Sequence, residues 1–204
     1  MGKKVVETRI LTYVAGLLHF YGVMQFDDLY RAVHEKMPEI LDRVKFRKLL
    51  EKTVLDDDSP YVFDGEDEFF FDIEVDDVEW VLDEQSQRSN VPFRPVSEEE
   101  AESLLADQYT LLWSAAETKF YEWLIERGGF DPDIALAAAL DYAGNIKNGL
   151  SPAELMKMVS AEILLENEEE LKQAISLVME FANHIPQWVL KGWRPTEILA
   201  MSGN

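Results

Sequence analysis

Histidines come first in a search for chemistry, because His is the side chain that most readily exchanges protons and binds metals near neutral pH. The chain has three of them, at positions 19, 34 and 184, which are too few and too scattered for a catalytic triad or a His cluster. Glu180 and His184 share one face of a predicted helix and could hold a metal with a carboxylate from another helix, such as Glu117 or Glu122. The sequence has no Glu-x-x-His pair that would add ligands from another helix, so we predict no metal site.

Other catalytic chemistry is excluded by residues that the sequence lacks. The absence of Cys removes disulfides, thiolate zinc sites and Cys nucleophiles. The phosphate-binding Gly-rich loops and the Gly-x-Ser-x-Gly motif are also missing. The acidic clusters that begin at Asp56 and Asp64 place Tyr61 and Phe69 where a calcium loop needs Gly. We therefore predict a protein that is not an enzyme, with no catalytic residue and no cofactor.

The charge of the chain is large and unevenly distributed. Its 204 residues carry 40 acidic and 19 basic side chains, a net charge of −21. Residues 1–55 have a balance of +3, residues 56–85 have fourteen acidic and no basic side chains, and residues 86–204 have a balance of −10. A field of this sign disfavours generic binding to nucleic acid and to anionic membranes.

The periodicity of residues 5–85 predicts three short helices and a β-hairpin. The first helix runs from Thr8 to Gly22, the second is capped by Asp27, and the third spans about residues 40–53. On the third helix the apolar and the basic side chains fall on opposite sides, with Phe46, Leu49, Leu50 and Val54 facing the core and Lys45, Lys48 and Lys52 facing away. Residues 61–63 and 69–71 are β-prone runs joined by an Asp-Gly turn, which predicts a hairpin.

This order of elements resembles the winged helix-turn-helix superfamily. In members that read DNA, the third helix enters the major groove and the hairpin, called the wing, contacts phosphate. The resemblance places five basic residues on the DNA side: Arg43, Lys45, Arg47, Lys48 and Lys52. The predicted wing departs from the pattern, because it carries Asp64, Glu66, Asp67 and Glu68 with no Lys or Arg. Phosphate contacts supply much of DNA affinity, so this wing argues against DNA binding.

A further helix is expected from Asp76, and two prolines then break all periodicity. We therefore predict a winged-helix-like domain over residues 5–88, a linker over 89–97, and a helical region over 98–204. Ser97 with Glu100 forms a capping box that opens one long helix ending at Gly128-Gly129. Caps at Asp131, Ser151 and Asn167 open three more helices, and short connections predict an antiparallel bundle. The expected fold is thus mainly α.

The last segment carries a recognisable spacing. Asn183, Pro186, Trp188, Gly192, Pro195 and Glu197, with Ile198 at the final apolar position, match a signature Asn-x-x-Pro-x-Trp-x-x-x-Gly-x-x-Pro-x-Glu-Leu. The segment resembles uncharacterised bacterial proteins, many of them Gram-positive, in which a short Cys-rich SEC-C zinc motif often follows. No Cys is present here, so the resemblance implies no metal. We expect an extended arm, with Thr196 capping a short final turn and with Trp188, Trp193 and Arg194 as a candidate interaction site.

The expected function is that of a non-enzymatic protein-interaction or regulatory module whose partner is another protein. The alternative is a DNA-binding transcriptional regulator that uses the basic third helix. A weaker alternative is an acidic DNA mimic. The sequence has neither an apolar run of about 18–20 residues nor a signal-peptide pattern, so we expect a cytoplasmic protein without a membrane span.

Overall fold

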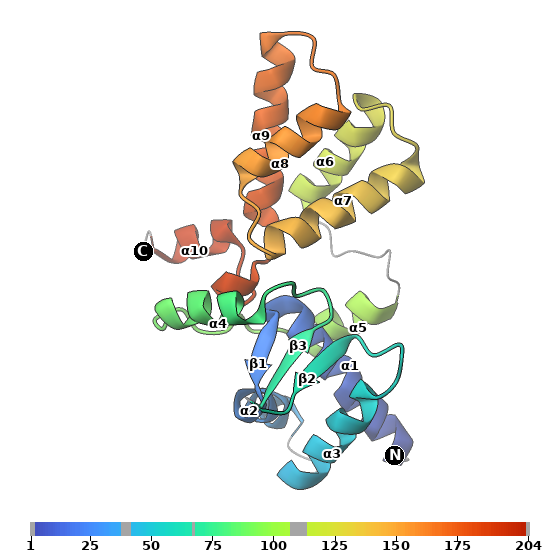
Figure 1. The fold of residues 1–204 in the computed structure, drawn as a ribbon, viewed down its shortest axis with the longest axis vertical. Helices are drawn as coiled ribbons and strands as arrows, with labels where there is room; N and C mark the ends of the chain where they lie inside the picture. Colours follow the sequence, from blue (N-terminus) through green and yellow to red (C-terminus); the bar gives the residue numbers. More distant parts are fainter. Residues whose placement is uncertain (1–2, 38–41, 67, 107–113, 203–204) are drawn as a thin grey trace. The chain divides into compact units, whose positions relative to one another are not determined.

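The computed structural model describes residues 3–37, 42–66, 68–106 and 114–202. The fold is mainly helical, as predicted: helices make up 67% and a small three-stranded antiparallel sheet lies near the N-terminus. The chain divides into two compact units, Met1–Leu112 and Trp113–Asn204, whose elements are labelled in Figure 1. Within the described residues, no helix combines the length and the apolar character that crossing a membrane requires.

The first unit contains five helices and three strands among its described residues. In chain order they are α1 (Lys3–Tyr21), β1 (Val23–Gln25), α2 (Phe26–Lys36), α3 (Arg43–Val54), β2 (Tyr61–Asp64), β3 (Phe69–Asp72), α4 (Val78–Gln87) and α5 (Glu98–Ala106).

The ends of these helices follow local sequence signals, with small corrections. Gly22 ends α1 in the left-handed region, at φ 74°, as predicted. The predicted cap at Asp27 is wrong, because α2 begins at Phe26 and Asp27 lies in its first turn, where a carboxylate interacts favourably with the helix dipole. Asp77 caps α4 in place of Asp76. Asp42 caps α3, and residues 38–41, where the sequence placed its start, lie outside the described residues.

The sheet has the order β1-β3-β2, with both pairs antiparallel. Val62 pairs with Phe71 and Phe63 with Phe70, which confirms the predicted hairpin. Strand β1 was not predicted, and its Met24 pairs with Phe70 from the other side. Three residues are too few to show an alternating pattern, and the strand exists because β3, 44 or more residues away in sequence, supplies its hydrogen bonds.

One apolar core joins the sheet to the helices of the first unit. Its aromatic centre is Phe26, Phe46 and Phe70, with ring centroids 6.0 Å apart for Phe26 and Phe46 and 6.3 Å for Phe26 and Phe70. The inward faces of the helices add Ile10, Val14, Leu17, Leu18, Leu29, Val33 and Leu50. The core therefore fixes α3 by Phe46 and Leu50, both fully buried, and leaves the opposite side of the helix outside it.

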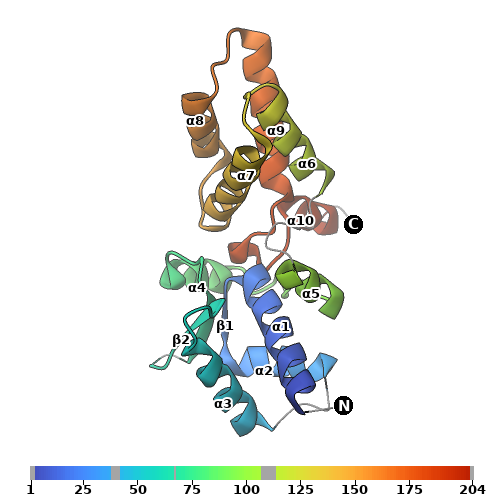
Figure 2. The same ribbon diagram turned by 90° about the vertical axis from the view of Figure 1, so that its right-hand side faces the viewer.

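Helix α5 differs from the prediction, which assigned residues 98 onward to the bundle. It lies alongside α1 in the first unit, as Figure 2 shows. The reason is a close approach at Gly16: a Cβ added there would lie 2.3 Å from the Cβ of Ala101, which is fully buried. The Arg9 guanidinium also donates two hydrogen bonds to the Glu98 carboxylate, at 2.6 and 2.8 Å.

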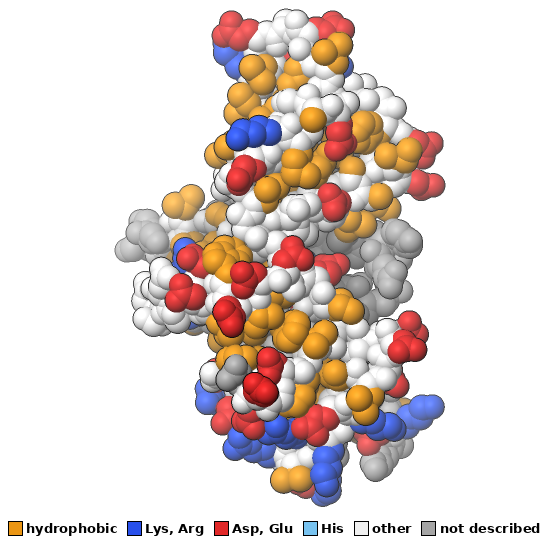
Figure 3. Space-filling view, in the orientation of Figure 1, with side chains coloured by type: hydrophobic (Ala, Val, Ile, Leu, Met, Phe, Trp, Pro, Cys, Tyr) orange, Lys and Arg blue, Asp and Glu red, His pale blue; other side chains and the backbone are white. Residues whose placement is uncertain are grey.

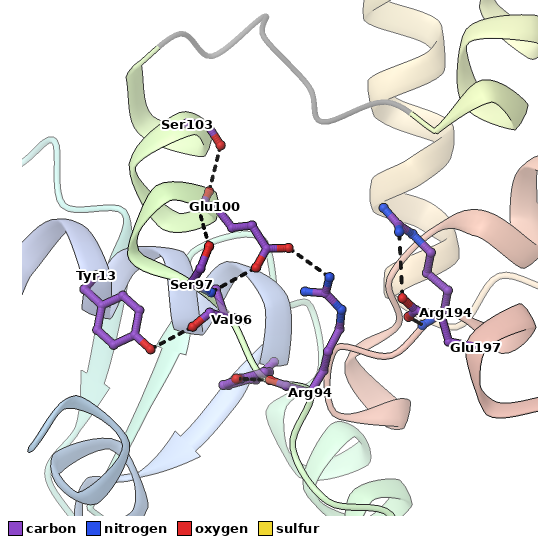
Figure 4. A network of polar contacts seen from close by, with 9 residues as sticks. Tyr13, Arg94, Val96, Ser97, Glu100, Ser103, Arg194 and Glu197 are labelled. Atoms are coloured by element: carbon purple, nitrogen blue, oxygen red, sulfur yellow. Dashed lines mark hydrogen bonds and ion pairs between the residues drawn. The ribbon is translucent and has the colours of Figure 1, made fainter. Parts of the chain in front are cut away.

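The predicted linker is likewise fixed to α1. The Tyr13 hydroxyl donates to the Val96 carbonyl at 3.0 Å, and the Tyr21 hydroxyl donates to the Arg94 carbonyl. Arg94 in turn donates to Glu100, whose carboxylate accepts the Ser97 N–H (Figure 4). The capping box predicted at Ser97 is confirmed, but the long helix predicted from it is wrong. Two helices, α5 and α6, occupy that range, and residues 107–113, including Leu112, lie outside the described residues.

The described part of the second unit is all helical. It contains α6 (Ala115–Glu126), α7 (Pro132–Lys147), α8 (Pro152–Glu162), α9 (Glu168–His184), a 3-10 turn η1 (Trp188–Leu190) and α10 (Pro195–Ser202). The predicted caps Asp131, Ser151 and Asn167 are confirmed. Helices α6 to α9 share one core that includes Phe120, Tyr142, Leu155, Val159 and Phe181. Although α7 is rich in apolar residues, it buries only one face, and Ile134 is 61% exposed.

The C-terminal arm is less extended than predicted. Residues 188–190 form η1, which Lys191 ends in the left-handed region at φ 55°, and α10 begins at Pro195. Thr196 does not cap a turn; its hydroxyl donates to the Asn183 carbonyl at 3.2 Å. Gly192 follows in the left-handed region at φ 84°, and the Gln187 N–H donates to the Trp193 carbonyl, so the chain turns between η1 and α10.

Candidate interaction face on the third helix

The five basic residues predicted on the third helix fall into two groups. Lys45, Lys48 and Lys52 are exposed on the side opposite Phe46 and Leu50, as the spacing predicts. Arg43 and Arg47 lie on the other flank, toward α2 and the hairpin, where their guanidinium groups lie over the Phe26 ring at 5.3 and 5.4 Å. The five were predicted to form one surface, and the structure separates them.

Arg47 is held in place by contacts on several sides. Its Nε atom lies 2.8 Å from Glu51 Oε1 and its Nη1 atom 2.5 Å from Glu68 Oε1. Its guanidinium also lies 5.4 Å from the centre of the Phe63 ring. The hydrogen bonds to Glu51 and then to Glu68 raise the pKa of Arg47, and the Arg47 guanidinium lowers the pKa of Glu68. Arg43 is paired in a similar way with Asp27.

The hairpin is fixed to this flank by its backbone. Glu68 has a φ of 60°, and its carbonyl accepts a hydrogen bond from the Phe26 N–H at 2.9 Å. The Asp64 carboxylate accepts the Glu66 N–H at 2.9 Å, and residues 61–72 contain no Lys or Arg. The hairpin therefore presents carboxylates, one of which neutralises a basic residue of α3.

The exposed side of α3 carries apolar as well as basic side chains. Val44 is 63% exposed and Leu55, the C-cap residue, is 83% exposed. Together with the three lysines they form what we call the α3 face: Val44, Lys45, Lys48, Lys52 and Leu55. Lys45 is paired with Asp42 at 2.6 Å, whereas Lys48 and Lys52 have no ion-pair partner among the described residues.

Acidic groups surround the α3 face. Figure 3 shows basic and acidic side chains close together where Figure 1 places α3. At the C-terminal end of α3, an open recess is lined by Thr53, Leu55, Asp56, Asp57, Asp58, Ser59 and Pro60. A polyanion that approached Lys52 and Leu55 would meet these three carboxylates as well.

The other predicted site, on the arm, belongs to the second unit and is largely internal. Trp188 is fully buried, and Lys147 Nζ lies 5.7 Å from the centre of its ring. Trp193 and Arg194 are half-buried; the Trp193 carbonyl accepts the Gln187 N–H, and the Arg194 N–H donates to Glu197. Burial also lowers the pKa of Lys191 in this segment. Because Trp188 is fully buried, it does not form an exposed interaction site.

The side chains of Glu180 and His184 have other partners and do not form a metal-binding pair. His184 Nδ1 lies 2.7 Å from the Glu180 carbonyl oxygen, and the Glu180 carboxylate pairs with Lys119 at 3.1 Å. Among the described residues, the group whose ligand atoms come together is a different one: His19, Asp72 and Glu74. This group was not predicted, because His19 and Asp72 are 53 positions apart in sequence and no spacing rule connects a helix end to a strand end.

The polar groups of the first unit thus give one exposed mixed face on α3 and one small group of possible metal ligands. In comparisons with known proteins, no family model, no curated protein and no solved structure matches this chain.

Proposed function

We propose that this protein is a non-enzymatic interaction or regulatory module that binds another protein through the α3 face. The observation that carries the proposal is the composition of that face, in which exposed Val44 and Leu55 accompany Lys48 and Lys52, which have no ion-pair partner among the described residues. A solvated charged helix face does not require large apolar side chains, whereas a protein interface combines apolar contacts with charge complementarity. The partner segment is expected to carry apolar side chains next to Asp or Glu.

The fold proposed for residues 3–72 is a winged helix-turn-helix. The element order α1-β1-α2-α3-β2-β3 supports it, because α2 and α3 follow each other as the two helices of a helix-turn-helix. The sheet order β1-β3-β2 also supports it, because β1 pairs with the second strand of the hairpin. For α6 to α9 we propose an antiparallel bundle, supported by their shared core and short connections.

DNA binding is the second candidate, and Lys45, Lys48 and Lys52 are the observation in its favour. In DNA-reading winged helices the wing and the flanks of the third helix supply phosphate contacts. Here Arg43 and Arg47 are paired with carboxylates, and the hairpin has only acidic charges. Counterion release from phosphate provides much of DNA affinity, so a protein segment fits this surface better than a duplex does.

The third candidate, an acidic DNA mimic, fits less well than protein binding, because Lys45, Lys48 and Lys52 interrupt a continuous negative surface.

The proposal can be tested by panning a random-peptide display library against the immobilised full-length chain. Enriched peptides are expected to combine Asp or Glu with apolar residues. Their affinity should fall about tenfold or more in Lys48→Glu and in Val44→Asp, since each substitution places a carboxylate against an acidic peptide. Lys157→Glu on α8 is the matched control, because it makes the same charge change at another exposed helix position.

A duplex of mixed sequence, titrated at low salt, tests the second candidate in parallel. We expect no binding that Lys48→Glu weakens more than Lys157→Glu does. Duplex binding that depends on Lys48, together with a library that yields no peptide dependent on the α3 face, would overturn the proposed function in favour of DNA binding.

A further inference from the structure

Three side chains of metal-ligating type converge at one edge of the first unit. His19 lies in the last turn of α1, Asp72 is the final residue of β3, and Glu74 follows in the next loop. One ligand atom from each of them lies within 4.8 Å of the other two. The elements that carry them are fixed by the core, since the Asp72 N–H donates to the Gly22 carbonyl at 2.8 Å.

Asp72 is the central member of this group, and its environment orients it. Its side chain is only 7% exposed, and carboxylates are seldom buried to this extent. One carboxylate oxygen, Oδ1, accepts the Glu74 N–H at 2.8 Å. The other, Oδ2, lies 3.4 Å from His19 Nδ1. Carboxylates that bind metals are commonly oriented by such a second hydrogen bond.

The separation of 3.4 Å is long for a hydrogen bond between an imidazole N–H and a carboxylate oxygen. It does match the distance between two ligands of one metal ion, because bonds of about 2.0–2.2 Å in a tetrahedral arrangement place ligand atoms roughly 3.4 Å apart. The Glu74 side chain is exposed, and one of its carboxylate oxygens lies within 4.8 Å of the other two ligand atoms, so Glu74 is the third candidate ligand.

We propose that His19, Asp72 and Glu74 bind one divalent transition-metal ion, of which Zn²⁺ is the type. An imidazole nitrogen with two carboxylate oxygens favours such ions over Ca²⁺ and Mg²⁺, which take oxygen ligands. The segment 56–85, with fourteen acidic and no basic side chains, attracts cations to this edge. Three protein ligands leave a coordination position for water or for a donor atom of another molecule.

An ion pair between protonated His19 and Asp72 is the competing explanation, because a positive charge near the C-terminal end of α1 is favourable. The two explanations differ at Glu74. A simple ion pair between His19 and Asp72 does not need the Glu74 side chain, whereas a three-ligand site does. Glu74→Gln is therefore the most informative variant, and it leaves the buried Asp72 unchanged.

The test is a calorimetric titration of the full-length, chelator-treated chain with Zn²⁺, in a buffer with excess Mg²⁺ to saturate the other surface carboxylates. We expect one saturable site per chain, with affinity lowered about tenfold or more in Glu74→Gln and in His19→Asn. His34→Asn is the matched control, since His34 is an exposed histidine of the same unit, and it should bind Zn²⁺ like the wild type.

Two further readouts keep the result interpretable. Zn²⁺ should raise the melting temperature of the wild type and of His34→Asn, and should raise that of Glu74→Gln by less at the same Zn²⁺ concentration. Co²⁺ should give the visible absorption of a four- or five-coordinate site in the same two proteins. The proposal is overturned if Zn²⁺ does not saturate one site, or if His19→Asn and Glu74→Gln bind it as the wild type does while circular dichroism shows all variants folded.

Discussion

At the scale of single residues, Arg47 and Lys48 are neighbours in sequence with opposite roles. Arg47 joins α3 to the hairpin through Glu51 and Glu68 and lies over two aromatic rings, whereas Lys48 has no ion-pair partner among the described residues. We expect Arg47→Ala to lower the free energy of unfolding by about 1–2 kcal/mol, because it removes cation–π contacts and partly exposed ion pairs. Lys48→Ala should change it by less than about 0.5 kcal/mol. Urea denaturation of the two variants measures both values.

The same pair of variants separates stability from recognition. Binding of an acidic peptide selected on the wild type should be weakened by Lys48→Ala at unchanged stability. Equal losses of stability in the two variants would show that Arg47 makes no special contribution to the fold, and would contradict the division of the basic residues into two groups.

At the scale of elements, the contact between α1 and α5 depends on the missing side chain of Gly16. A Cβ at this position would overlap Ala101, so Gly16→Ala should destabilise the chain by roughly 1–3 kcal/mol, although Ala is the better helix former. Ala101→Gly should cost about 1 kcal/mol by itself. Because the second substitution removes the overlapping atom, the double variant should be more stable than the sum of the two losses predicts. Additive losses in a double-mutant cycle would argue against this close approach.

The ion pair of Arg9 and Glu98 gives the same contact a dependence on pH. The hydrogen bond from Arg9 holds the pKa of Glu98 below its ordinary value of 4.5. A carboxylate with a lowered pKa in the folded state stabilises the fold fully above the unfolded value, and this contribution disappears as the pH falls through the folded value. Glu98→Gln should therefore be less stable than the wild type at pH 7, by under about 1 kcal/mol, since both side chains are about a third exposed.

The measurement for this pair is urea denaturation of both proteins from pH 7 downward. The difference in the free energy of unfolding should be constant near neutral pH and should shrink below about pH 4.5. A difference that persists unchanged at the lowest pH where the protein is folded would assign the effect to packing rather than to charge.

Elements that depend on local signals could be predicted from the sequence. Helices α7, α8 and α9 begin at the predicted caps, because a capping side chain acts within its own first turn. Strand β1 depends on Phe70 and the position of α5 depends on Gly16, both far away in sequence, so no local sequence pattern predicts them. Residue 98 therefore looked like the start of a bundle when it belongs to the first unit.

The same distinction between local signals and distant partners applies to the candidate site. The exposure of Lys45, Lys48 and Lys52 follows from their spacing relative to Phe46 and Leu50. The pairing of Arg47 with Glu68 depends on how the hairpin returns to α3, and the meeting of His19 with Asp72 depends on where α1 and β3 end. Both contacts are set by tertiary packing, which periodicity does not describe.

At the scale of the whole molecule, the net charge of −21 opposes the compact state, because like charges are brought together on folding. The density of negative charge is highest in residues 56–85, and Asp56, Asp57 and Asp58 line one open recess. Salt screens repulsion between exposed charges at separations near the Debye length, about 10 Å at 0.1 M. Salt also screens the attraction within exposed ion pairs. Repulsion is still the larger effect, because carboxylates are in large excess over basic groups.

We therefore expect neutral salt to stabilise this protein. Raising the concentration of NaCl from low values toward about 0.5 M should increase the melting temperature by about 2–4 °C per kcal/mol of repulsion removed. Replacing Asp56, Asp57 and Asp58 together by Asn should raise the melting temperature at low salt and reduce its dependence on salt, because part of the repulsion is then already gone. Calorimetric scans of both proteins across the salt series measure the effect. A melting temperature that falls with added salt in the wild type would mean that its ion pairs, such as Arg9 with Glu98 and Arg47 with Glu68, outweigh the repulsion.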